Sequence, residues 1–182
     1  MESEFRNVIT LDATDVELMN QWKELHLEWL HSNDLWEIAD QNQLETPIAS
    51  ITDKGGLIFG IVIEDILICS VAIKPINTRR YEIMKMAVSP KYRKKGLGQT
   101  LLSHVIDYSI NTMKTTKYID REIGTGTGAG LELGCATGNE VGVLQLDSSS
   151  KLQSALVLYK KHGFVGVYEG TDVYMERTLD LR

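Results

Sequence analysis

The sequence has little cysteine, no long apolar run and no excess of positive charge. Its two cysteines, Cys69 and Cys135, form no CxxC pair, which favours a reduced, cytoplasmic chain over one held by disulfides. No apolar run approaches the roughly 20 residues of a membrane-spanning helix, and the opening MESEFRN is unlike a signal peptide. The net charge of -6 argues against nucleic acid and anionic membranes as partners.

The composition and the hydrophobic pattern instead indicate one α/β domain spanning 1–182. With 43% hydrophobic and 24% charged residues, a chain of this length can bury a core without disulfides or metals. Apolar periodicity predicts helices over 15–30, 36–44, 97–113 and 148–164, and strands over 4–12, 57–75 (a hairpin), 81–88, 141–147, 165–170 and 172–179. The order β-α-α-β-β-β-α-β-α-β-β is that of a mixed α/β domain. The glycine-rich residues 114–140 are predicted to be irregular.

Two glycine-rich segments compete as the place where a nucleotide cofactor binds. LELGCATGNE (131–140) resembles the loop with which methyltransferases hold S-adenosylmethionine, because an apolar strand and an acidic residue precede G-x-x-x-G. Such a loop needs a helix and further strands behind it. Here the apolar strand 141–147 follows directly, and the chain ends at 182. A methyltransferase is therefore the disfavoured alternative.

The other segment, RKKGLGQT (93–100), lies between a predicted strand and a predicted helix. Gly96 and Gly98 let the backbone approach an anion closely, and the amides and dipole of the helix N-terminus attract negative charge. The segment predicts a pyrophosphate site, although it is neither a P-loop nor a GxGxxG loop. A basic surface turn that caps a helix is the alternative. The predicted cofactor-binding residues are Arg93, Lys94, Lys95, Gly96, Leu97, Gly98, Gln99 and Thr100.

Two motifs make the chain resemble the GNAT superfamily of acetyl-CoA-dependent N-acetyltransferases. The acyl-CoA signature Q/R-x-x-G-x-G/A is met at 93–98, and the second signature A-x-x-L-Y-x-x-x-G-F is met at 155–164. The resemblance covers about 50–175 and implies a mostly antiparallel sheet flanked by helices. The chain departs from the family pattern through an insertion at about 116–140 and through Leu152, where many members carry asparagine.

The resemblance also implies how acetyl-CoA, the co-substrate, binds without a metal. A bulge splays the strand 81–88 away from 141–147 and opens a V-shaped cleft. The pantetheine arm pairs with the backbone of Met86, Ala87 and Val88, and an N–H near Val88 stabilises the thioester oxygen.

Two side chains are candidates for the proton transfers. Tyr159 is placed by the second signature as the acid that protonates the leaving thiolate, and Glu82 is the candidate base, acting through a water. The alternatives are a core tyrosine and a solvent-facing glutamate paired with Lys85 or Arg80.

The predicted reaction moves an acetyl group from acetyl-CoA to a primary amine of a small molecule or peptide, by direct attack in a ternary complex. A module that binds acyl-CoA without turnover is the alternative. The protein is expected to be a monomer or a homodimer. The residues expected to wall the acceptor pocket are aromatic: Trp22, Trp29, Trp36, Tyr168 and Tyr174.

Overall fold

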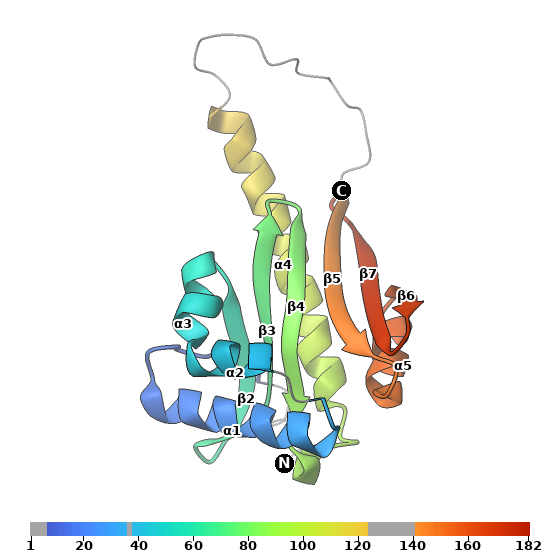
Figure 1. Cartoon of the computed structure of the whole chain (residues 1–182). Coiled ribbons are helices and arrows are strands. Elements are labelled where there is room, and N and C mark those ends of the chain that lie inside the picture. Colours follow the sequence, from blue (N-terminus) through green and yellow to red (C-terminus); the bar gives the residue numbers. More distant parts are fainter. Residues whose placement is uncertain (1–6, 36–37, 124–140) are drawn as a thin grey trace.

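The structure is a computed structural model that describes residues 7–35, 38–123 and 141–182 (Figure 1). Its strands are β1 (Ile9–Thr10), β2 (Leu57–Ile63), β3 (Ile66–Asn77), β4 (Arg80–Val88), β5 (Val141–Ser149), β6 (Val165–Glu169) and β7 (Asp172–Asp180). Its helices are α1 (Val16–Ser32), α2 (Ile38–Glu45), α3 (Pro47–Ser50), α4 (Leu97–Ile123) and α5 (Gln153–Lys161). None of the described helices is long and apolar enough to cross a bilayer.

The strands form one sheet in the order β1-β2-β3-β4-β5-β7-β6. All neighbours pair antiparallel except β4 and β5, which run parallel. The parallel pair is the consequence of the crossover through α4, which lies against the opposite face of the sheet from α1 and α2 (Figure 1). The predicted mixed, mostly antiparallel α/β architecture is therefore confirmed.

The sheet separates two apolar cores. The larger lies on the side of α4 and α5 and includes Leu101, Leu144 and Phe164, whereas Trp22 and Ile58 belong to the smaller core under α1. Helix α1 begins where the Asp15 carboxylate accepts a hydrogen bond from the N–H of Leu18 at 3.0 Å, a side-chain cap that satisfies an unpaired helix amide. Burial of these apolar faces fixes both helical layers on the sheet.

Two predicted helix boundaries were wrong by at least five residues. Helix α4 continues to Ile123, because no glycine or proline interrupts the chain between Met113 and Gly124. Helix α5 begins only at Gln153, because β5 continues through Ser149, which pairs with Asp172 of β7. The remainder of the predicted insertion, 124–140, with its methyltransferase-like segment, lies outside the described residues.

A bulge interrupts β4 near its carboxyl end. Met84 pairs with Ala72 and Ala87 with Ser70, so two residues of β4 face one residue of β3. Lys85, within this bulge, has a φ of 49°, a left-handed conformation that is uncommon for a residue with a side chain. The bulge that the family resemblance implied is thus present.

Candidate active site

The cleft of the molecule opens where β4 and β5 separate. The two strands pair from Arg80 and Val143 to Ile83 and Leu146, and the ladder ends there. A cavity of about 710 Å³ begins at this point and reaches the start of α4. Figure 1 shows the two strands diverging toward the end at which α4 begins. The predicted V-shaped cleft is therefore present.

The glycine loop forms one end of the cleft. Gly96 has a φ of +82°, and a Cβ built there would meet no heavy atom within 4 Å. A Cβ on Gly98 would lie 3.2 Å from Cδ2 of Leu158. The absence of side chains at both positions leaves the N-terminus of α4 open to the cleft, as close backbone approach by an anion requires.

Most, but not all, of the predicted loop residues line the cleft. Those that do are Arg93, Lys94, Gly96, Leu97, Gly98 and Gln99. Lys95 and Thr100 lie outside the lining: the Lys95 ammonium lies 5.1 Å from the ring centroid of Tyr92, and the Thr100 N–H donates to the Gly96 carbonyl at 3.0 Å.

The edge of β4 forms the middle of the cleft, through Met86, Ala87 and Val88. On one side Ala87 and Val88 pair with β3. Among the described strands, β5 pairs with β4 only as far as Ile83, so the other edge of these residues faces the cavity. A strand edge of this kind can hydrogen-bond an extended ligand that carries amides.

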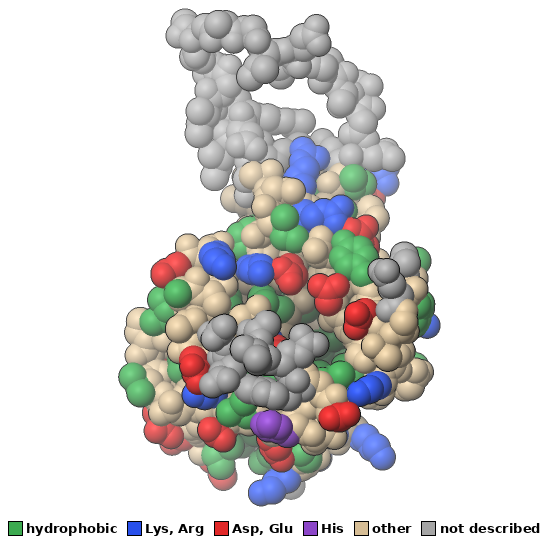
Figure 2. All heavy atoms as spheres, in the orientation of Figure 1, with side chains coloured by type: hydrophobic (Ala, Val, Ile, Leu, Met, Phe, Trp, Pro, Cys, Tyr) green, Lys and Arg blue, Asp and Glu red, His purple; other side chains and the backbone are tan. Residues whose placement is uncertain are grey.

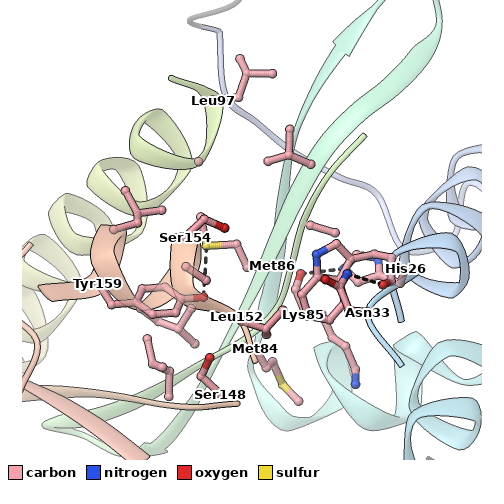
Figure 3. A pocket seen from close by; sticks show the side chains of 18 of the residues that line it. His26, Asn33, Met84, Lys85, Met86, Leu97, Ser148, Leu152, Ser154 and Tyr159 are labelled. Carbon is pink, nitrogen blue, oxygen red and sulfur yellow. Dashed lines mark hydrogen bonds between the residues drawn. The ribbon is translucent and has the colours of Figure 1, made fainter. Parts of the chain in front are cut away.

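Tyr159 reaches the cleft from α5. Its hydroxyl lies 3.7 Å from Sδ of Met86, with Tyr159 and Met86 approaching from opposite walls (Figure 3). The side chain is 8% exposed, and burial raises the pKa of its phenol to about 12. The hydroxyl therefore keeps its proton at neutral pH and presents it to the cleft.

Glu82 lies on the opposite face of β4 from the core residues Tyr81 and Ile83. Its carboxylate forms an ion pair with the Lys74 ammonium at 2.9 Å, and the two residues are direct partners in the β3–β4 ladder. The alternative partners considered from sequence are engaged elsewhere, since Lys85 pairs with Asp40 and Arg80 with Glu176. A band of acidic and basic side chains crosses this face (Figure 2).

Asp147 is a second carboxylate of the cleft, and sequence reasoning did not select it. It directly follows Leu146, the last residue of β5 that pairs with β4. Burial first, and then the charges of Glu82 and Asp172, raise the pKa of its carboxyl. Its position at the carboxyl end of a predicted strand is the sequence signal that could have identified it.

The far end of the cleft is walled by α1 and α2, called here the helical wall. It consists of His26, Trp29, Leu30, Asn33, Asp40 and Gln43. Of the five aromatic residues predicted for the acceptor pocket, Trp29 lines the cleft and Trp22 is buried in the core. Tyr168 and Tyr174 do not line the cleft, and Trp36 lies outside the described residues.

A cleft with a glycine loop, a free strand edge and a buried phenol is the kind of site expected in an acyl-CoA-dependent transferase. The family model described as Acetyltransferase (GNAT) family matches residues 17–123, more than half of the chain. The chain therefore belongs to the GNAT acetyltransferase family, as its motifs indicated.

Solved structures share the fold at low sequence identity. A GNAT-family acetyltransferase from Staphylococcus aureus Mu50 is 17% identical, with a TM-score of 0.66 over 97% of this chain and 99% of that one. The PaiA N-acetyltransferase from Thermoplasma acidophilum, in complex with coenzyme A, is 18% identical, with a TM-score of 0.60 over 95% and 98%. The ribosomal-protein-S18-alanine N-acetyltransferase from Escherichia coli is 15% identical, with a TM-score of 0.58 over 96% and 93%. No curated protein matches the chain in sequence.

Proposed function

We propose that the protein transfers the acetyl group of acetyl-CoA to a primary amine of a small molecule or peptide, by direct attack in a ternary complex. One observation carries this proposal. A single cleft joins the open glycine loop at Gly96 and Gly98, the free edge of β4 and the buried hydroxyl of Tyr159. The structural similarity to a PaiA N-acetyltransferase bound to coenzyme A supports the choice of donor.

The donor, acetyl-CoA, binds along the cleft from the end that the glycine loop forms. The amides at the start of α4, with Arg93 and Lys94, hold the diphosphate. The pantetheine amides pair with the backbone of Met86 to Val88, which leaves the thioester between β4 and Tyr159. A backbone N–H near Val88 then stabilises the oxygen that becomes negative during attack.

Two proton transfers accompany the attack. The amine nitrogen bonds to the thioester carbon, and the carbon–sulfur bond breaks as the tetrahedral intermediate collapses. Tyr159, protonated at neutral pH because burial raises the pKa of its phenol to about 12, donates its proton to the departing thiolate. No metal takes part in either step.

The amine must lose a proton before or during attack, because a lysine-type amine has a pKa of about 10.4. Glu82 receives it through a water in this proposal, with its charge balanced by Lys74 at 2.9 Å. Asp147 supports this step as the neighbouring carboxylate, because its raised pKa makes it a better proton acceptor than an ordinary aspartate. The acceptor enters along the helical wall.

A GNAT-shaped sensor that binds acyl-CoA without turnover is the second candidate, and the presence of Glu82 and Tyr159 in the cleft favours the enzyme over it. Release of free thiol from acetyl-CoA, measured across a panel of amines, together with binding of coenzyme A, separates the two. Amine-dependent thiol release supports the enzyme. Tight binding with no release from any amine would support the sensor, and no binding at all would remove both.

We place this reaction in the cytoplasm, with a monomer or homodimer as the active form. The support for a reducing compartment is Cys69, which is a free thiol buried in the core. Burial raises the pKa of this thiol to about 12, so it is unreactive at neutral pH.

A further inference from the structure

One residue of β4 is held by both helices of the helical wall. The backbone carbonyl of Lys85 lies 2.8 Å from Nε2 of His26 in α1, and the Lys85 ammonium forms an ion pair with Asp40 of α2. His26 is 1% exposed, and the side chains of Lys85 and Asp40 are 12% and 20% exposed. Figure 3 shows His26 and Lys85 facing each other on the side of the cleft opposite Tyr159.

These contacts lie at the bulge where the pairing of β4 with β3 is interrupted. Lys85 has a φ of 49° and stands with Met86 in the bulge between the pairs Met84–Ala72 and Ala87–Ser70. A left-handed residue with a side chain costs about 1–2 kcal/mol relative to the usual backbone conformations. The conformation persists only where neighbouring groups hold it, and His26 and Asp40 are such groups for Lys85.

Of the two contacts that His26 makes, the one to Lys85 joins α1 to the bulge of β4. Nδ1 lies 2.9 Å from the carbonyl of Trp22, which also accepts the regular helical hydrogen bond within α1. The bulge removes Lys85 from the β3–β4 register, and its carbonyl meets Nε2 of His26 at 2.8 Å. Burial lowers the pKa of His26, and the neutral tautomer with hydrogen on Nε2 satisfies this carbonyl.

We propose that His26 and Asp40 are positioning residues, which hold the carbonyl and the ammonium of Lys85 and thereby set the angle at which Met86 to Val88 face the acyl donor. They do not touch the reacting atoms. The same two side chains line the helical wall of the cleft, along which the acceptor enters in the proposed function.

Hydrogen exchange of the amides of 84–88 tests the positioning without relying on activity. The variant His26→Phe keeps a ring of similar size but removes the N–H, and its matched control is His104→Phe, which removes a partly buried histidine outside the cleft. Asp40→Asn is compared with Glu45→Gln, another α2 carboxylate in an ion pair. We expect about fivefold to tenfold faster exchange in His26→Phe and Asp40→Asn, consistent with losing one hydrogen bond, and wild-type exchange in both controls.

The expected effect on acetyl-CoA binding rests on the proposed function and is measured in a separate experiment. We expect the Kd for coenzyme A and the KM for acetyl-CoA to rise about fivefold in His26→Phe, with kcat falling less. His26→Gln, whose amide N–H can reach the Lys85 carbonyl, recovers part of the loss. Wild-type exchange at 84–88 in both His26→Phe and Asp40→Asn would overturn the positioning proposal, and failure of His26→Phe to fold leaves Asp40→Asn to decide it. Faster exchange at 84–88 in the two variants, together with absent coenzyme A binding in the unmodified protein, would count against the proposed function alone.

Discussion

The hydroxyl of Tyr159 is buried but directed at the sulfur of Met86, 3.7 Å away, in the wall of an open cleft. In the proposed function this oxygen lies where the sulfur of the bound thioester passes β4. Burial keeps its proton in place at neutral pH.

We therefore predict that Tyr159→Phe lowers kcat by more than about tenfold, because a general acid contributes about 10²- to 10⁴-fold. Coenzyme A affinity stays nearly unchanged, because the ring remains. Steady-state kinetics and calorimetry measure the two quantities, with Tyr168→Phe, on the exposed part of β6, as the control. Unchanged turnover would remove Tyr159 from the mechanism.

Glu82→Gln is predicted to lower kcat/KM by an amount that shrinks as the pH rises. The reason is that the amine, with a pKa of about 10.4, loses its proton without help at alkaline pH. The pH profile of kcat/KM checks this, with Glu176→Gln as a control, because Glu176 is on the same face but does not line the cleft. A loss that is constant with pH would show that Glu82 binds the acceptor instead.

At the residue scale, the sequence predicted the site residues that belong to motifs. It missed the residues that lie beside them only because distant helices and strands pack there. Tyr159 and Gly96 belong to short local patterns, so their positions in the cleft were predictable. Asp147 and His26 acquire their surroundings from strands and helices distant in sequence. Long-range pairing of this kind leaves no periodic signal.

At the scale of elements, α4 is the longest packing surface of the fold, and Gly142 of β5 allows its close approach. A Cβ at Gly142 would lie 2.2 Å from Sδ of Met113, which is buried in the α4 side of the core. The flexible methionine side chain would have to move, and with it the packing of the α4–β5 crossover.

Gly142→Ala is accordingly predicted to destabilise the protein by about 1–3 kcal/mol, the usual cost of overpacking a core. Chemical denaturation measures the change in free energy of unfolding. The double variant with Met113→Ala, which removes the clashing atoms, should lose less than the sum of the two single changes. Strict additivity of the two substitutions would contradict this packing account.

Element boundaries show where the sequence was insufficient. The glycines that suggested irregular structure over 114–140 begin only at Gly124, and α4 continues to Ile123, the residue before it. For α5 the opposite error arose, because Ser148 and Ser149 read as helix caps although pairing with β7 keeps them in β5. Tertiary pairing decided the second case and local propensity the first.

At the scale of the whole molecule, the cleft divides the sheet into two halves, and a ligand bound between β4 and β5 contacts both. Coenzyme A at about 100 times its Kd should stabilise the folded state by about 2.7 kcal/mol. For a chain of this size we predict a rise in Tm of about 5–10 °C, measured by differential scanning calorimetry. A larger rise with S-adenosylmethionine would favour the methyltransferase alternative.

The central claim is that the backbone at the start of α4 holds the diphosphate, and two glycines allow a matched test by calorimetric titration with coenzyme A. Gly96 and Gly170 both have positive φ, and a Cβ at either meets no heavy atom within 4 Å, so alanine strains the backbone similarly in each. Only Gly96 lines the cleft. We predict that Gly96→Ala raises the Kd at least about tenfold, or about 1.4 kcal/mol, while Gly170→Ala binds as the wild type does. Equal Kd values for the two variants would contradict the account.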